Sequence, residues 1–487
     1  DVSLTEAATL IGLLQNPSLY DPRVRPERTL ERRNVVLGQL AKYEFITEED
    51  LPKLQDEPLN LHYKVENQNT GAAPYFREAI RQQVLSAIKE LNQDRPEDQQ
   101  LNLYTSGLRI YTSIDSRMQK YAEESVKEHM RAEQKLFYEH WRGRNPWVNE
   151  EMKEIKGFLR DAMKRTQRYR DLMSAYNNDE FKVWEELRRP IKMTVFTYDG
   201  DKDTTLSPMD SLNYYKRILN CGMMAMDPMN GHVKAWIGGI NYKYFKFDHI
   251  SQSKRQPGST FKPFVYGAAI ENEIVTPCDE LVDEPVTFGE EDGLSGGTWT
   301  PQNSDGKYSY QNMKMRRAMG LSINSISAKL MKQLGPAKVA EFAHKCGIES
   351  SLHEVPSLCL GASEVSLMEQ VAGYSTMANG GERIDPILVL RITDKVGNVL
   401  KEYSPPVKAV IKPETAYLMT YMLQGAIQEP GGTAEGLKRT SIVAGNEIGA
   451  KTGTTSNYSD GWFMGVTQKI VAGVWVGGDD RSIHFRS

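Results

Sequence analysis

The sequence predicts an α+β fold in which an antiparallel sheet is combined with a helical subdomain. Short apolar strands separated by glycine-rich turns begin near residue 217 and return after residue 449. Helical patterns fill the sequence between them. A sheet whose strands are separated along the chain by a helical insert is typical of a layered α+β domain.

Length and composition limit the classes of function. The chain of 487 residues is longer than chains that fold around a single hydrophobic core, so two or three domains are expected. Hydrophobic residues make up 39%, as in an ordinary folded protein. With 25% charged residues and a net charge of −4, nucleic-acid binding is not predicted.

The N-terminal part, residues 1–43, is predicted to be helical. Ser3 and Glu6 have the spacing of a capping box ahead of an apolar run, and a proline break near residue 17 separates a second, arginine-rich helix. Residues 44–115 are predicted to be a linker because their first half is polar and rich in proline. Within that linker we expect one helix and one strand, over about 75–92 and 108–112.

Residues 116–216 form a charged segment in which glycine is nearly absent. Long helices or a helical hairpin are expected there, with the charges on solvated helix faces, and no function is assigned. Residues 217–487 form the last predicted domain, with a hairpin turn at Asp227–Gly231. Its expected helices are 260–272, 311–334, 336–346 and 365–378, and its expected late strands are 449–455, 460–467 and 469–477.

Cysteine and apolar patterns argue against a metal centre and a membrane span. The four cysteines stand far apart, and none has the spacing of metal ligands, so neither a metal nor a cofactor is predicted. No stretch reaches the ~18 apolar residues of a membrane helix. Asp1 begins directly in a helical pattern without a leader, so we expect a truncated or processed chain that is soluble as given.

A serine three residues before a lysine is a weak signal for nucleophilic catalysis. The spacing occurs four times, at Ser86/Lys89, Ser251/Lys254, Ser259/Lys262 and Ser304/Lys307. Only Ser259 follows a Pro-Gly turn and opens an apolar helix. On such a helix Lys262 shares a face with Ser259, and the helix N-terminus favours negative charge on the serine oxygen.

Lys262 can accept the serine proton only if its pKa falls well below about 10.4, which burial or a second cation can cause. Lys451 is the candidate for that cation, on a strand in which Gly453 allows another backbone to approach. Ser322 and Asn324 supply a hydroxyl and an amide on one turn, which suits proton transfer and binding of a carbonyl group.

These motifs resemble those of the serine penicillin-binding proteins, specifically the bifunctional class A type. Ser-x-x-Lys, Ser-x-Asn and Lys-Thr-Gly-Thr follow one another in that family's order. Further stretches that are similar to the family are Arg255–Gly258, Trp299–Asn303, Tyr374–Gly381 and Asp460–Phe463. The resemblance implies the penicillin-binding, transpeptidase-like fold for residues 217–487.

The resemblance also implies a role for each motif residue. Ser259 would attack a D-Ala-D-Ala stem peptide and form an acyl-enzyme, with Lys262 as base and Ser322 as proton carrier to the leaving amine. Asn324 would hold the acyl side chain. The terminal carboxylate would be bound by Lys451, Thr452 and Thr454, with Gly453 between them. Backbone N–H groups of Ser259 and Thr454 would form the oxyanion hole. β-Lactams would be covalent inhibitors.

Residues 1–43 resemble the end of a peptidoglycan glycosyltransferase domain whose catalytic glutamates lie further upstream. We therefore expect that this chain does not polymerise lipid II although its full-length parent would, and Glu6 is interpreted as a helix cap. The resemblance implies a membrane anchor in the parent and a catalytic domain on the outer, periplasmic face of the bacterial membrane. The family's closing helix is not found, so one face of the sheet is expected to be uncovered.

Other functions remain open at this stage. A β-lactamase shares the motifs, but no Glu four residues before an Asn lies between Asn324 and Lys451. A D,D-carboxypeptidase and a non-catalytic β-lactam sensor or scaffold are further alternatives. An esterase elbow is suggested by the Gly-x-Ser-x-Gly match at Ser295, although its flanks predict a loop. Ser322 could instead cap a helix, Asn324 could satisfy buried backbone, and Lys451 could be an edge-strand lysine.

Overall fold

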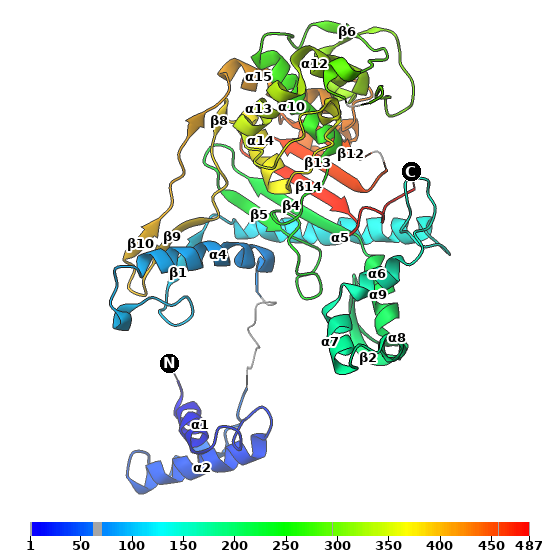
Figure 1. Cartoon of the computed structure of the whole chain (residues 1–487). Coiled ribbons are helices and arrows are strands. Elements are labelled where there is room, and N and C mark those ends of the chain that lie inside the picture. The colour runs from blue at the N-terminus through cyan, green and yellow to red at the C-terminus, as the bar shows by residue number, and fades with distance from the viewer. Residues whose placement is uncertain (1, 62–70, 295, 456, 487) are drawn as a thin grey trace. The chain divides into compact units, whose positions relative to one another are not determined.

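The structure is a computed structural model that describes residues 2–61, 71–294, 296–455 and 457–486. The chain divides into two compact units, Asp1–Gly71 and Ala72–Ser487 (Figure 1). Within the described residues, no helix combines the length and the apolar character that crossing a bilayer requires.

The first unit contains the two helices that the sequence predicts within residues 1–43 and a third, short helix that falls in the predicted linker. Ser3 and Glu6 form the expected capping box, in which the Ser3 backbone N–H donates to the Glu6 carboxylate at 2.7 Å. The buried guanidinium of Arg33 donates to the carbonyl oxygens of Gln55 and Glu57 at 2.8 and 2.6 Å, which ties the second helix to the third. The helices are α1 (Leu4–Gln15), α2 (Pro26–Lys42) and α3 (Leu51–Asp56).

A five-stranded antiparallel sheet organises the second unit. The spatial order is β12-β13-β14-β4-β5, so the last three strands of the chain join the hairpin at Asp227–Gly231. This arrangement confirms both the predicted hairpin and the predicted late strands. The strands are β4 (Asn220–Met226), β5 (Val233–Ile237), β12 (Gly449–Thr454), β13 (Asp460–Val466) and β14 (Val471–Gly477).

A helical layer covers one face of this sheet (Figure 1). The inserted helices share one large core with the inward side chains of the sheet, and α10 is buried along almost its whole length. One helix, α15, was not predicted. The layer contains α10 (Lys262–Glu271), α11 (Met315–Gly320), α12 (Asn324–Leu334), α13 (Pro336–Cys346), α14 (Leu367–Ala378) and α15 (Pro413–Gln428).

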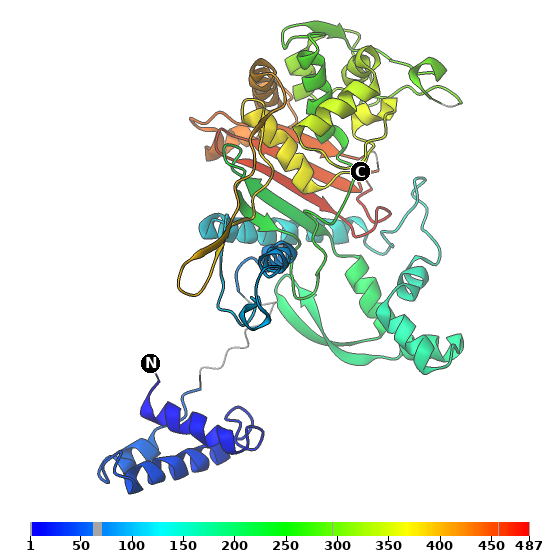
Figure 2. The same ribbon diagram turned by 60° about the vertical axis from the view of Figure 1, so that its left-hand side comes forward.

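The opposite face of the sheet is covered by α5 (Ser116–His140), as Figures 1 and 2 show. Apolar side chains of this helix, such as Met130 and Phe137, form a core cluster with the outward side chains of β4 and β5. On the same face of β14, Val474 and Val476 are only half-buried and line a cavity of about 430 Å³. The expected uncovered face is therefore covered in part.

The charged segment between residues 116 and 216 contains more than the predicted long helices. After α5 come three short helices, a two-stranded hairpin and α9. The helices pack around a small core of their own. The hairpin was missed; its two-residue turn is Tyr198-Asp199, and Gly200 begins the second strand. The elements are α6 (Phe158–Lys164), α7 (Gln167–Ala175), α8 (Glu180–Arg188), β2 (Ile191–Thr197), β3 (Gly200–Leu206) and α9 (Pro208–Lys216).

The predicted helix and strand of residues 44–115 are present as α4 (Pro74–Leu91) and β1 (Arg109–Thr112). Strand β1 pairs with β9 (Val389–Thr393), which also pairs with β10 (Val399–Glu402). This small antiparallel sheet connects the beginning of the second unit with a segment nearly 300 residues later in the chain. Smaller strand pairs are β6 (Glu280–Val282) with β7 (Asn312–Lys314) and β8 (Glu382–Arg383) with β11 (Lys408–Ala409).

Candidate active site

The loop that carries Ser259 is held by backbone contacts on both sides. Arg255 makes two backbone hydrogen bonds with Val365, of 3.0 and 2.9 Å. Gly258 has a φ of +55°, and a Cβ at this position would lie 2.8 Å from the carbonyl oxygen of Thr454. Glycine is required because the left-handed backbone and the neighbouring strand both exclude a side chain. Ser259 follows in the short 3₁₀ turn that leads into α10.

Strand β12 lies against this loop and is an edge strand of the sheet. A Cβ at Gly453 would lie 2.6 Å from the carbonyl oxygen of Pro257, so the two backbones touch there. Thr452 is half-buried and Thr454 is exposed. The three predicted substrate-binding residues thus lie on an edge strand, whose outer backbone groups can pair with an extended peptide.

Lys262 is fully buried at the first position of α10. Its Nζ donates to the carbonyl oxygen of Ser322 and to Oδ1 of Asn324, both at 2.6 Å, and lies 3.3 Å from Oγ of Ser322. Burial lowers the pKa of Lys262 to about 7. Much of this amine is therefore neutral near pH 7, as a proton acceptor requires.

Lys451 approaches the same hydroxyl from β12. Its fully buried Nζ donates to Oγ of Ser322 at 2.9 Å and to the carbonyl oxygen of Thr452 at 2.8 Å. Burial is the main cause that lowers the pKa of Lys451, and the charge of Lys262 lowers it further. The Ser322 hydroxyl thus lies between two amines from distant parts of the chain.

The structure does not place a hydrogen bond between Ser259 and Lys262. Within the described ranges the half-buried Ser259 hydroxyl has no hydrogen-bond partner, because the Lys262 amine binds Ser322 and Asn324 instead. Catalytic hydrogen bonds are often long before substrate binds. The motifs meet as a hydrogen-bonded cluster of Lys262, Ser322, Asn324 and Lys451, beside the turn that carries Ser259.

The turn that carries Ser322 explains why the predicted helix over 311–334 is interrupted. Ser322 has a φ of +60°, a left-handed conformation that terminates α11 before Asn324 begins α12. Such backbone costs about 1–3 kcal/mol for a non-glycine residue. The interruption points both the Ser322 hydroxyl and the Asn324 amide at Lys262, whereas a continuous helix would not keep this geometry.

Two residues without a predicted role hold Asn324 in place. Oδ1 of Asn303 accepts from the backbone N–H groups of Asn324 and Ser325 at 2.9 and 3.2 Å. The buried carboxylate of Asp283 accepts from Nδ2 of Asn303 at 2.8 Å and from the Ser325 hydroxyl at 2.6 Å. Asn303 could have been found from the sequence because it ends the Trp299–Asn303 stretch that resembles the family. No sequence pattern marks Asp283.

A buried ion pair fastens the Ser259 loop to the sheet. Nε of Arg255 lies 3.3 Å from Oδ1 of Asp460, which has no exposed surface. The same carboxylate accepts from the indole of Trp475 at 3.0 Å and from the Ser459 hydroxyl at 2.8 Å. Arg255 and Asp460 are the first residues of two stretches that resemble the family. The sequence does not predict that they form an ion pair.

The alternative nucleophile Ser295 lies outside the described residues. In the described part around it, no strand leads in and no helix follows, since only a 3₁₀ turn, Glu290–Asp292, precedes it. An esterase elbow needs a strand before its serine and a helix after it. The surrounding structure therefore gives no support to the esterase alternative.

Family models match most of the second unit. The penicillin binding protein transpeptidase domain matches residues 221–478, and the penicillin-binding protein middle domain matches residues 142–219. Penicillin-binding protein 1A of Aquifex aeolicus is 31% identical over 486 residues, covering 98% of this chain and 63% of that protein. Penicillin-binding protein 1A of Neisseria lactamica is 28% identical over 526 residues, covering 98% and 61%.

The crystal structure of penicillin-binding protein 1A from Haemophilus influenzae has a TM-score of 0.68 at 23% identity, over 99% of this chain and 76% of that one. This likeness confirms the predicted fold. The chain spans about three fifths of the length of the curated relatives named above. With the model of the penicillin-binding protein transpeptidase domain matching more than half of its residues, the chain belongs to the penicillin-binding proteins.

Proposed function

We propose that this protein is a serine D,D-transpeptidase that cross-links peptide stems of the bacterial cell wall through an acyl-enzyme on Ser259. The observation that carries the proposal is the cluster in which the amines of Lys262 and Lys451 share the Ser322 hydroxyl. A base, a proton carrier and a second amine that can bind a carboxylate are thereby gathered beside the Ser259 turn. Membership of the family supports the same assignment.

In the proposed acylation, Oγ of Ser259 attacks the carbonyl carbon of the D-Ala-D-Ala bond while neutral Lys262 accepts its proton. The oxyanion is stabilised by the backbone N–H groups of Ser259 and Thr454. The Ser322 hydroxyl, which touches both amines, delivers a proton to the departing D-Ala nitrogen. The products are a serine ester and free D-Ala.

In the second step, an amine from a neighbouring stem attacks the ester, forms the cross-linking amide and returns the serine proton. Asn324 holds the acyl side chain, and Lys451, Thr452 and Thr454 bind the terminal carboxylate. The edge position of β12 suits this role because an extended stem can add along it. β-Lactams are proposed to acylate the same serine and to leave slowly.

The proposal is tested by treating the purified chain with fluorescent penicillin and mapping the labelled peptide. A stable adduct on Ser259, together with release of D-Ala from a stem peptide, is expected. Label elsewhere contradicts the assignment, and an adduct without any D-Ala release indicates a sensor or scaffold. Fast nitrocefin turnover indicates a β-lactamase. D-Ala release that never gives a cross-linked product with an amine acceptor indicates a carboxypeptidase.

We further propose that the longer protein carries a glycosyltransferase domain, uses lipid II, and is anchored with its catalytic domain on the periplasmic side of the bacterial membrane. The resemblance of residues 1–43 to the end of such a domain supports this setting. The test is glycan polymerisation from lipid II, which is expected of the longer protein and not of this chain alone.

The rate of acylation is expected to rise with pH around neutrality. Only the neutral form of Lys262 can accept a proton, and its pKa lies at about 7. Below that value the second-order rate constant for penicillin should fall by about tenfold per pH unit, and above it the rate should level off. Stopped-flow measurements from about pH 5.5 to about 8.5 cover the transition. A flat profile would contradict the role of Lys262.

Asp283→Asn is expected to slow acylation about 10- to 100-fold, because Asn303 then loses its charged partner and Asn324 shifts. Thermal unfolding should reveal a loss of about 1–3 kcal/mol. The matched control is Glu369→Gln. This nearly buried carboxylate also accepts several hydrogen bonds, from Ser350 and Ser366, but none from the Ser322–Asn324 turn. If both variants lost the same acylation rate, Asp283 would have only a general structural role.

A further inference from the structure

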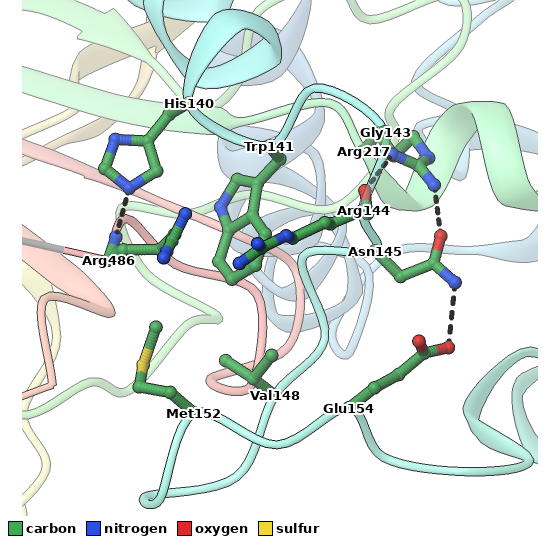
Figure 3. Close-up of a pocket in the computed structure, with 10 residues that line it drawn as sticks. All are labelled: His140, Trp141, Gly143, Arg144, Asn145, Val148, Met152, Glu154, Arg217 and Arg486. Carbon is green, nitrogen blue, oxygen red and sulfur yellow. Dashed lines mark hydrogen bonds between the residues drawn. The ribbon is translucent and has the colours of Figure 1, made fainter.

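A cavity of about 960 Å³ lies where three separate segments of the chain meet. The end of α5 with the loop that follows it, Arg217 after α9, and the segment near Arg486 all contribute to its wall (Figure 3). None of the motif residues lines it. Its lining residues are His140, Trp141, Gly143, Arg144, Asn145, Val148, Met152, Glu154, Arg217 and Arg486.

Arg217 is a half-buried cation that is bonded only to neutral oxygens. Its Nε donates to Oδ1 of Asn213 at 3.0 Å, its Nη1 donates to the carbonyl oxygen of Arg144 at 3.1 Å, and its Nη2 donates to Oδ1 of Asn145. Its guanidinium lies over the ring of Trp147, with 5.3 Å to the centroid. In the described residues no carboxylate is within ion-pair distance of Arg217; burial lowers the pKa of the guanidinium, and the more distant charge of Glu154 raises it by less.

Two further guanidiniums surround the cavity without an acidic partner in the described part of the chain. Arg144 is exposed, and Arg486 lies over Trp141 at 5.7 Å from the ring centroid. Figure 3 shows Arg486 and His140 on one side of Trp141, and Arg217 with Asn145 on the other.

The other titratable groups of the wall leave this positive charge uncompensated. Nε2 of His140 accepts from the backbone N–H of Arg486 at 3.0 Å, and burial lowers the pKa of this imidazole, which is therefore neutral. Glu154 is the one acid among the lining residues, and it accepts from Nδ2 of Asn145 at 2.8 Å. Three guanidiniums against one carboxylate leave an excess of two positive charges.

We propose that this cavity is a binding site for a ligand that carries about two negative charges, supplied by carboxylate or phosphate oxygens. Planar guanidiniums bind such oxygens in pairs, and the fixed orientation of Arg217 against Trp147 reduces the entropy lost on binding. Trp141, Val148 and Met152 add apolar wall for the body of the ligand. The site is independent of the transpeptidase chemistry because it shares no residue with it.

Calorimetric titration of the purified chain with inorganic phosphate and, separately, with N-acetyl-Asp-Asp tests the site. Saturable binding of at least one probe is expected, and the tighter probe identifies the source of the oxyanion. The double variant Arg144→Gln, Arg486→Gln should weaken that binding by at least about tenfold, since both side chains are exposed and can be exchanged without disturbing the core. Arg217 is left intact because it also supports the loop.

Arg142→Gln is the matched control, because this exposed arginine is next to Trp141 in the chain but does not line the cavity. It should bind the probes like the unaltered protein. All variants should be acylated by penicillin at the unaltered rate. Absence of binding for both probes, or binding that the double variant leaves unchanged, would overturn the proposal.

Discussion

Ser259→Ala should abolish covalent labelling by penicillin, with a loss of acylation rate of at least ~10⁴-fold. The reason is chemical, because the other hydroxyl of this turn, that of Thr260, is fully buried and donates to the carbonyl oxygen of Pro257 at 2.8 Å. The stability of the Ser259→Ala variant should differ little from that of the unaltered protein, since the Ser259 side chain is half-buried and has no hydrogen-bond partner among the described residues. Gel fluorescence after labelling, with thermal unfolding alongside, measures both effects.

The chain supplies a matched control for this substitution. Ser86 also precedes a lysine, Lys89, by three residues on a helix, but both are exposed on α4. Ser86→Ala should be labelled at the normal rate. A Ser259→Ala protein that still becomes penicilloylated would remove the basis of the proposed mechanism.

Lys262→Arg should lower the acylation rate by about 10²- to 10⁴-fold, the usual contribution of a general base. Arginine keeps a positive charge at every relevant pH, so it cannot accept the serine proton. Because a bulkier cation in a fully buried position can destabilise the protein, Lys262→Gln provides a neutral variant that retains hydrogen bonding to Ser322. Both variants should bind penicillin reversibly but acylate slowly.

The measurement is the single-turnover acylation rate at several pH values. In both variants the dependence on pH near 7 should disappear together with the rate, a result that a merely structural role of Lys262 does not predict. Lys89→Arg is the control for an exposed lysine with the same spacing. Unchanged acylation in folded Lys262→Gln would assign the base to another group.

Local patterns predicted the elements that have strong periodicity. The hairpin β4–β5, the strands β12 to β14 and helices such as α13 follow directly from apolar spacing and turn residues. Helix α15 was missed, although Pro413 at its start and the buried spacing of Ala416, Met419 and Leu423 carried a signal. The pairing of β1 with β9 could not be predicted because it joins segments far apart in the chain.

At the site, sequence motifs selected the residues but not the contacts between them. The meeting of Lys262 and Lys451 at Ser322 depends on a left-handed backbone conformation that a serine rarely adopts, so periodicity indicated an unbroken helix instead. Asp283 acts through Asn303, and such indirect contacts leave no pattern of spacing. The motifs therefore named the site residues, whereas only the fold shows that these residues lie close together.

The position of α5 limits how the protein can be divided for experiments. This helix precedes residue 221, where the match to the transpeptidase family begins, yet it closes one side of the sheet that carries Lys451. A recombinant piece that started at the family boundary would expose the apolar side chains of β4 and β5 to water and would tend to aggregate. Expression should therefore start upstream of α4, so that α5 and the strand partner of β9 are both retained.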